Sequence, residues 1–396
     1  MVSRGRVGEL EALELWNTED AVELGRPADL RKYAITVASR DWTVETIVRQ
    51  VAQGNINLDP AFQRRSAWKD SRRSRLIESF ILGFPVPQVV LAENPRERGT
   101  FIVIDGKQRL LTVAGLYLSS YRSYWNEARL SGLDVLKSFN RVPLDEFLSS
   151  EKWSNEQRQL ANSDIRTTII TGFQDEDVLY DIFYRINTGS VPLSSQELRQ
   201  VLNRGGFAEF LLTVTTQANP LWQVLRISSP DARLRDVELL LRLISLALFA
   251  SAYQGDMRGF LDQTMKSLNK NWSQRRHEIE DLTRELFAGV EAGLEIFGTE
   301  LGRKFTGKKP EYALNRALFE VQAYYLSLPA VRRSALQSRD ALITHSRMLF
   351  QDREFISSIE STTKSISNYR LRFGRYRRML QDTLGIPVEA LKIASK

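Results

Sequence analysis

The stretch FIVIDGKQRLLTV, Phe101–Val113, joins two patterns of different kinds. Its first residues, FIVID, are mostly apolar and predict a buried strand that ends at Asp105. A polar Gly-Lys-Gln-Arg turn follows, and then apolar residues resume at helical spacing. We therefore predict a strand-to-helix junction whose turn carries a carboxylate, an amine, an amide and a guanidinium.

The polar residues of this junction suit a phosphate and a metal ion. Asp105 ends a strand, where α/β folds tend to hold ligands, and its carboxylate suits Mg²⁺ or the positioning of a water. Gly106 allows a tight turn, the start of the next helix favours an anion, and Lys107 and Arg109 add cations. The alternative is purely structural: Asp105 caps the helix and Arg109 forms a salt bridge with a nearby carboxylate.

The composition of the whole chain is that of a soluble globular protein. Of its 396 residues, 42% are hydrophobic and 26% are charged, and the length favours two domains. The net charge of +7 is compatible with nucleic acid or nucleotide partners. The absence of cysteine excludes disulfides, thiolate metal sites and cysteine nucleophiles. The two histidines, His277 and His345, lack metal-ligand spacing, which argues against a zinc site or an HNH nuclease centre.

The sequence pattern predicts neither a signal peptide nor a membrane span. The start, MVSRGRVGELEALELW, carries charges where a signal peptide needs an apolar run. The most apolar segment, LLLRLISLALFASAY from Leu239, is interrupted by Arg242 and is too short to cross a bilayer. We therefore expect a cytoplasmic protein with no membrane partner, and we expect this segment to be a buried helix.

The first half of the chain mixes helical and strand patterns. Its predicted helices are DWTVETIVRQVAQG, SRRSRLIESFILG, RLLTVAGLYLSSY and DVLYDIFYRINTG. Its predicted strands are PVPQVVLAE, FIVID and IRTTIITG, and the turn NPRERGT between the first two favours a hairpin. INLDPAFQRRSAW is expected to be extended and turn-like, because Pro60 breaks any helix.

Beyond Leu193 the apolar spacing is helical almost throughout. The predicted fold class is therefore α+β, with an α+β domain followed by a mostly α-helical C-terminal domain. The predicted boundaries are an N-terminal arm at 1–40, the α+β domain at 41–200 and the helical domain at 201–396.

Several motifs of the chain resemble one known family. IDGKQR resembles the DGQQR signature of the GmrSD N-terminal domain family, a ParB/sulfiredoxin-like domain of modification-dependent restriction systems. FQRRSAW and RLIESFILGFPVPQVVLAE are similar to that family's arginine, tryptophan and helix leading to a Pro-x-Pro strand. FYRINTGSVPLSSQELR resembles its FxxxN motif, with Phe183 and Asn187, and RLRDVELLLRLISLALF resembles its helical region. The resemblance covers most of the chain from residue 41 onward.

The resemblance implies a ParB-like fold with a site for a nucleoside triphosphate, GTP or ATP, and Mg²⁺. The implied catalytic residues are Asp105, Gln108, Arg109 and Asn187, with Asp105 as the metal ligand. The implied phosphate-binding residues are Gly106, Lys107, Arg64 and Arg65, because arginine forks match phosphate oxygens. Lys107 stands where the family usually has glutamine, a departure that bears on hydrolysis more than on binding.

The implied function is that of a component of a prokaryotic anti-phage or restriction system. Such a protein binds and hydrolyses a nucleoside triphosphate and couples this to DNA recognition or cleavage. Many relatives carry an HNH nuclease half that this chain lacks, so a partner nuclease is expected unless the N-terminal domain itself cleaves DNA with Mg²⁺. The alternative is a non-catalytic adaptor that senses a nucleotide or DNA and recruits a separate effector chain. A homo-oligomer is compatible with both, and a structural partner with a vestigial pocket is a third alternative.

Two arginine-rich segments are candidate DNA contacts, namely SRRSR from Ser71 and NYRLRFGRYRRML from Asn368. The candidate DNA-binding residues are Arg72, Arg73, Arg370, Arg372, Arg375, Arg377 and Arg378. The alternative for these arginines is an ordinary solvated charged face. The apolar residues of the second segment fall on one helical face and are expected in the core, namely Tyr369, Phe373, Tyr376 and Leu380.

Overall fold

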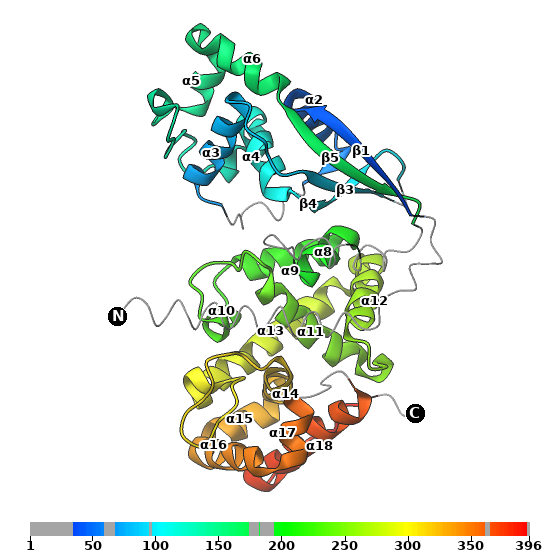
Figure 1. Ribbon diagram of the computed structural model, residues 1–396. Coiled ribbons are helices and arrows are strands. Elements are labelled where there is room, and N and C mark those ends of the chain that lie inside the picture. Colours follow the sequence, from blue (N-terminus) through cyan, green and yellow to red (C-terminus); the bar gives the residue numbers. More distant parts are fainter. Residues whose placement is uncertain are drawn as a thin grey trace. The chain divides into compact units, whose positions relative to one another are not determined.

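The computed structural model describes residues 35–58, 68–94, 97–173, 182, 194–360 and 365–393. These residues form two compact units that divide between Leu193 and Ser194 (Figure 1). The first unit combines a five-stranded sheet with helices, and the second is built from helices. The predicted α+β fold class is confirmed.

The sheet of the first unit has the order β1-β5-β3-β4-β2. Its strands are β1 (Thr36–Thr43), β2 (Ile56–Asn57), β3 (Val89–Glu93), β4 (Phe101–Asp105) and β5 (Asp164–Thr171). β1 pairs antiparallel with β5, and β3 pairs antiparallel with β4, which confirms the predicted hairpin. β3 pairs parallel with β5, and β2 pairs parallel with β4, so the sheet is mixed.

The helices of the first unit were predicted in part. They are α2 (Val44–Ala52), α3 (Asp70–Ile81), α4 (Lys107–Tyr117), α5 (Leu144–Ser149) and α6 (Ser154–Asn162), with short 3₁₀ turns η3 (Ser119–Tyr124), η4 (Lys137–Phe139) and η5 (Glu151–Trp153). The first three helices and β5 confirm the sequence patterns. β1 begins inside the stretch expected to be an arm, and α5 and α6 were not predicted. The predicted helix DVLYDIFYRINTG lies outside the described residues apart from Ile182.

One hydrophobic core holds α2, α3 and α4 against the sheet. Their buried members include Val44, Ile47, Ile77, Phe80, Leu110 and Val113, which meet Val89, Leu91 and Val103 of the central strands. Burial of each such side chain stabilises the fold by about 1.5–3 kcal/mol. The core therefore fixes the end of β4 relative to the start of α4.

The polar face of α3 holds a neighbouring loop. Asp70 accepts hydrogen bonds from the backbone amides of Asn126 (3.1 Å) and Glu127 (2.9 Å). One and two turns further on, Ser74 accepts from Ser131 N (2.9 Å) and Glu78 from Leu136 N (2.7 Å). This spacing of four residues places three acceptors on one side of the helix. These three polar residues of α3 are therefore structural.

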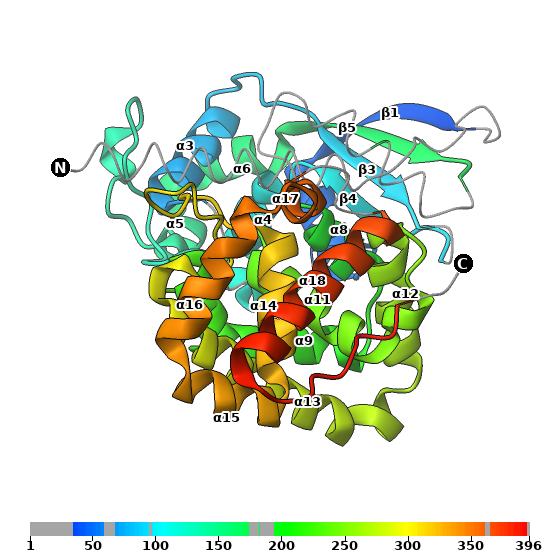
Figure 2. The ribbon, with the colours of Figure 1, turned by 90° about the horizontal axis from the view of Figure 1, so that it is seen from below.

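The second unit confirms the predicted helical region. Its helices are α8 (Ser195–Leu202), α9 (Gly206–Thr216), α10 (Pro220–Leu225), α11 (Arg235–Phe249), α12 (Met257–Lys270), α13 (Trp272–Phe297), α14 (Arg316–Ser327), α15 (Pro329–Gln337), α16 (Arg339–Met348), α17 (Arg353–Glu360) and α18 (Ile366–Leu384), with 3₁₀ turns η7 (Ala250–Ala252), η8 (Gly298–Glu300) and η9 (Leu349–Gln351). Helix α18 packs against α14, α16 and α17, as Figure 2 shows.

Most of the apolar segment that begins at Leu239 lies in α11, and five of its leucines are buried as predicted, namely Leu239, Leu240, Leu241, Leu243 and Leu246. Among the described helices, none is long and apolar enough to cross a membrane.

A network of buried charges joins α11, α14 and α18. Glu238 accepts hydrogen bonds from Arg242 (2.7 Å) and Arg316 (2.9 Å). Glu320 accepts from Arg242 (2.9 Å) and from the hydroxyl of Tyr369. The side chains of these charged residues are 1–3% exposed. Each carboxylate thus has more than one hydrogen-bond donor, as buried charges require.

Candidate functional site

The strand-to-helix turn predicted from the sequence lies at the end of β4. Asp105 is the last residue of this strand, Gly106 is the N-cap of α4, and Lys107 opens the helix. Gly106 has φ +95°, a conformation that L side chains rarely adopt. A Cβ atom there would lie 2.7 Å from Cγ2 of Val89. Both the backbone angle and the packing therefore require glycine at this turn.

The pairing of β3 with β4 is irregular next to this turn. Leu91 pairs with Val103, but Val90 pairs with Asp105, so β4 contains one extra residue. Bulges of this kind bend a strand and re-aim its side chains, and they are common beside functional sites. The irregularity places Asp105 opposite Val90, at the end of the strand from which α4 begins.

Arg109 connects the two sides of the junction. Its Nη2 donates to Oδ2 of Asp105 (2.8 Å) and to the carbonyl oxygen of Gln88 (2.9 Å). The Arg109 side chain is 12% exposed and that of Asp105 is 23% exposed. Nε of Arg109 is buried and has no hydrogen-bond partner among the described residues. The salt bridge of the structural alternative is thus present, and one buried N–H group of the guanidinium has no partner among the described residues.

Two residues at the junction were missed by the sequence analysis. The carbonyl oxygen of Gln88 accepts from Arg109, and its side-chain oxygen accepts from the hydroxyl of Thr168 on β5 (3.1 Å). Gln88 is a polar residue in the apolar run PVPQVVLAE, which is the signal that could have identified it. These bonds link β5, β3 and the start of α4 around Asp105.

The junction offers little to a metal ion by itself. The described residues contain no group of three or more His, Cys, Asp or Glu side chains that could hold one. Mg²⁺ usually takes one or two carboxylates together with substrate phosphates. Asp105 therefore fits a Mg²⁺ ion that arrives with a nucleotide, rather than a resident metal centre.

The structure describes two of the remaining residues predicted for the nucleotide site and leaves three outside its described residues. Lys107 and Gln108 are half-buried in the first turn of α4, beside Arg109. Arg64, Arg65 and Asn187 lie outside the described residues.

The structure corrects one of the two DNA contacts predicted on α3. Arg73 is 1% exposed, and its Nη1 lies 2.7 Å from Oδ1 of Asp70. Its guanidinium is therefore occupied inside the protein, and the predicted DNA contact is not supported. Arg72 is exposed, and its guanidinium lies 4.4 Å from the centre of the Trp68 ring.

A second correction concerns Arg372 on α18. It is 1% exposed, stacks on the ring of Tyr369 at 3.6 Å and donates to the carbonyl of Ser358 (3.0 Å). Because it is buried, its predicted DNA contact is not supported. The aromatic face of the same helix is buried as predicted, namely Tyr369, Phe373, Tyr376 and Leu380.

The other arginines of α18 lie nearer to solvent. Arg375 forms ion pairs with Asp352 (3.4 Å) and Glu354 (2.6 Å), and Arg377 is half-buried. Arg370 and Arg378 are exposed. The helix therefore presents fewer cations to a DNA backbone than its sequence suggests.

The fold and the junction together define an α+β domain with a charged turn at the carboxyl end of a central strand. Residues 44–202 match the family described as GmrSD restriction endonuclease, N-terminal domain. The chain therefore carries a domain of this family, as the DGKQR motif predicted, and the family indicates a component of a restriction system. No curated protein and no solved structure matches the chain significantly.

Proposed function

We propose that the β4–α4 junction binds a nucleoside triphosphate, GTP or ATP, with Mg²⁺ and hydrolyses it. The hydrolysis is coupled to DNA recognition or cleavage in the restriction system. The observation that carries this proposal is the pairing of Asp105 with Arg109 at a left-handed glycine turn, where no described residue bonds to the buried Nε of Arg109.

The turn suits the phosphate groups of a nucleotide. The start of α4 carries the positive end of the helix dipole, and Lys107 and Arg109 lie in its first turn. Gly106 lets the backbone approach the ligand closely. The planar guanidinium of Arg109 matches two phosphate oxygens at once. These groups stay fixed while negative charge develops on the phosphate, which is how such sites lower the barrier.

Asp105 is the acidic member of the site. Its carboxylate lies 2.8 Å from Arg109 and is 23% exposed, so it can change partner when phosphate engages the guanidinium. It is then available to orient the attacking water or to hold Mg²⁺. The metal, when bound with the triphosphate, neutralises charge on the phosphate oxygens.

The second candidate is a non-catalytic adaptor that binds the nucleotide or DNA and recruits a separate nuclease or effector chain. Lys107, in place of the family's usual glutamine, favours this candidate. The two candidates share the nucleotide site and differ in turnover.

Phosphate release separates these candidates. The purified chain is incubated with Mg²⁺ and each of the four ribonucleoside triphosphates, with and without plasmid DNA, beside Asp105→Ala. The matched control is Asp134→Ala, which removes an aspartate that is 72% exposed in the same unit. Turnover that is lost in Asp105→Ala and retained in Asp134→Ala supports hydrolysis at the junction.

Two results would overturn the proposal. Equal turnover in Asp105→Ala and wild type would exclude the junction as the hydrolytic centre. No phosphate release in any combination would exclude hydrolysis, and the adaptor candidate would then lead.

A further inference from the structure

A short hairpin projects between α13 and α14 in the helical unit. The backbone amide of Glu311 donates to the carbonyl oxygen of Lys304 (2.8 Å), and the backbone amide of Thr306 donates to the carbonyl oxygen of Lys309 (3.1 Å). Gly307 has φ +85°, which allows the tight turn. Lys308 and Lys309 are exposed at its tip. The hairpin Lys304–Glu311 thus presents two amines to solvent.

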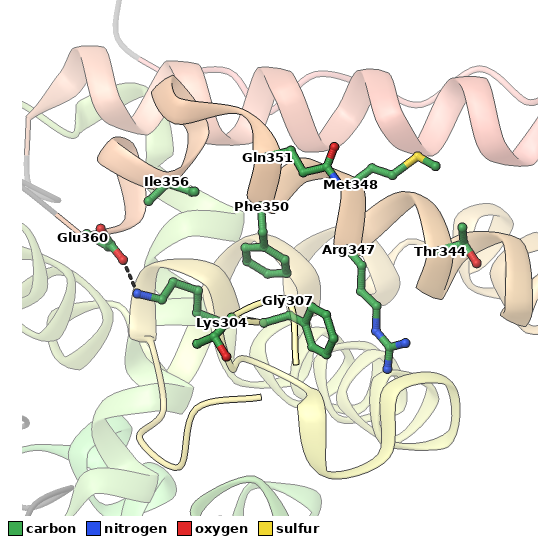
Figure 3. A pocket seen from close by; sticks show the side chains of 11 residues that line it. Lys304, Gly307, Thr344, Arg347, Met348, Phe350, Gln351, Ile356 and Glu360 are labelled. Atoms are coloured by element: carbon green, nitrogen blue, oxygen red, sulfur yellow. Dashed lines mark hydrogen bonds and ion pairs between the residues drawn. The ribbon is translucent and has the colours of Figure 1, made fainter. Parts of the chain in front are cut away.

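A pocket of about 520 Å³ lies beside this hairpin. Its lining includes Lys304 and Phe305 from the hairpin, and Arg347, Phe350, Ile356 and Glu360 from the α16–α17 segment. Figure 3 shows the ring of Phe350 pointing into this space and the amine of Lys304 directed at Glu360. Its volume falls in the range of about 300–1,000 Å³ that small-molecule sites occupy.

The pocket combines aromatic rings with cations. Phe305 and Phe350 are half-buried, so both rings retain surface that an incoming group can contact. The guanidinium of Arg347 lies 4.5 Å from the centre of the Phe305 ring. Aromatic side chains bordered by lysine and arginine are the groups that bind unstacked bases and their phosphates. The lining is therefore suited to a flat aromatic ligand that carries negative charge.

The charges around the pocket show where an anion would go. Lys304 forms ion pairs with Glu311 and Glu360, and Arg347 forms one with Glu300. No ion pair among the described residues includes Lys308 or Lys309. The tip of the hairpin is therefore where an added negative charge meets cations that no described carboxylate already neutralises.

We propose that this pocket binds one nucleotide unit whose base is unstacked. The base contacts Phe305 and Phe350, and the phosphate lies toward Lys308 and Lys309. This site belongs to the helical unit and is separate from the β4–α4 junction, so it does not depend on hydrolysis there. It would give the chain a DNA contact in place of the buried arginines of α3 and α18.

The test measures the binding of a fluorescent single-stranded oligothymidine to the full chain by fluorescence anisotropy. Neither Mg²⁺ nor a nucleoside triphosphate is added. The variants are Phe350→Ala, Phe350→Leu, and the double variant Lys308→Ala with Lys309→Ala. The controls are Phe84→Ala, which removes an aromatic side chain that is 57% exposed in the other unit, and Lys137→Ala, an exposed lysine of that unit. Phe350→Leu keeps apolar volume but removes the ring, and thermal melting confirms that each variant folds.

We expect both Phe350 variants to weaken binding about 10-fold, because each removes a ring on which the base stacks. The double lysine variant should weaken binding and reduce its salt dependence. If thymidine monophosphate displaces the oligothymidine, the pocket also accepts free nucleotides. If it does not displace the bound strand, the nucleotide unit that the pocket binds comes from DNA. Unchanged affinity in the folded Phe350 variants, no binding by wild type, or tighter binding of the matching duplex would overturn the proposal.

Discussion

The two units of the protein each pair arginine with carboxylate, but they do so in different surroundings. At the β4–α4 junction, the side chains of Arg109 and Asp105 are 12% and 23% exposed. In the helical unit, the side chains of Glu238, Arg242 and Glu320 are 1–3% exposed. A buried charge that loses its partner is costly, whereas a partly exposed one can be compensated by water or ligand. The same chemistry is therefore structural in the buried network of α11, α14 and α18 and partly open to solvent at the β4–α4 junction.

The number of partners reinforces this difference. Glu238 meets two arginines, and Glu320 meets an arginine and a tyrosine. At the junction a single Arg109 nitrogen bridges Asp105 and a backbone carbonyl, and its Nε has no partner among the described residues. A phosphate can thus engage Arg109 without leaving a buried cation unpaired.

The largest effect is expected from Glu238→Gln. This change keeps the shape of the side chain but removes the charge that balances Arg242 and Arg316, so it should lower the free energy of unfolding by about 3 kcal/mol. Urea denaturation measures this loss. A loss below about 1 kcal/mol, the size expected of an exposed pair, would show that the two regions do not differ as described.

The carboxylate of Glu238 should also make the free energy of unfolding depend on pH. Burial alone would raise the pKa of Glu238, but Arg242, Arg316 and Arg199 outweigh burial and lower it from 4.5 to about 2. A depressed pKa contributes stability that is present above pH 4.5 and lost as the pH falls toward 2. Between these values, the stability difference between wild type and Glu238→Gln should therefore shrink. Denaturant titrations across this pH range measure it, and a constant difference would contradict the assignment.

Substitution of Gly106 should have a smaller effect. Gly106→Ala places a Cβ atom 2.7 Å from Val89 at φ +95°, and should cost about 1–2 kcal/mol of unfolding free energy. Gly54→Ala is the matched control, because φ is +78° there but nothing lies within 4 Å of the added atom. The difference between the two variants, measured by urea denaturation, reports the packing at the junction. Equal losses would show that Val89 does not restrict the turn.

The smallest change in stability is expected for Asp105→Asn. A partly exposed ion pair contributes roughly 0–1 kcal/mol, so thermal melting should change little. Phosphate release should nevertheless be lost, because the carboxylate is the acidic group of the proposed site. If this variant lost as much stability as Glu238→Gln, the junction pair would be structural too and the comparison between the regions would fail.

The sequence predicted the parts of the fold in which apolar spacing is regular. The β3–β4 hairpin, the strand-to-helix turn and the helical second unit were all predicted from such spacing. β1 was missed because Thr36–Asp41 are exposed on both sides of the strand, which leaves no apolar alternation. Helix α6 was missed because Leu160 is its single buried residue.

The burial of two predicted DNA-contact arginines and the role of Gln88 depend on tertiary contacts, which sequence patterns show only in part. Arg372 contacts Tyr369 on its own helix, but it is buried against Ser358 and lies near Glu320, which is distant in the chain. The partner of Arg73 was visible in principle, because Asp70 lies three residues earlier on the same helix face. The backbone carbonyl of Gln88 that accepts from Arg109 leaves no signal in residue type, whereas its side chain, which accepts from Thr168, is the polar residue that stands out in the apolar run.

The most direct test of the nucleotide site is equilibrium binding of GTP and ATP, with Mg²⁺, measured by calorimetry. Wild type is compared with Arg109→Ala and with Arg72→Ala, which removes an exposed arginine that stacks on Trp68. We predict that Arg109→Ala loses about 10-fold or more in affinity, because a charge-assisted hydrogen bond contributes about 1.5–3 kcal/mol, and that Arg72→Ala binds like wild type. A folded Arg109→Ala protein that binds both nucleotides as tightly as wild type would contradict the assignment of the β4–α4 junction as the nucleotide site.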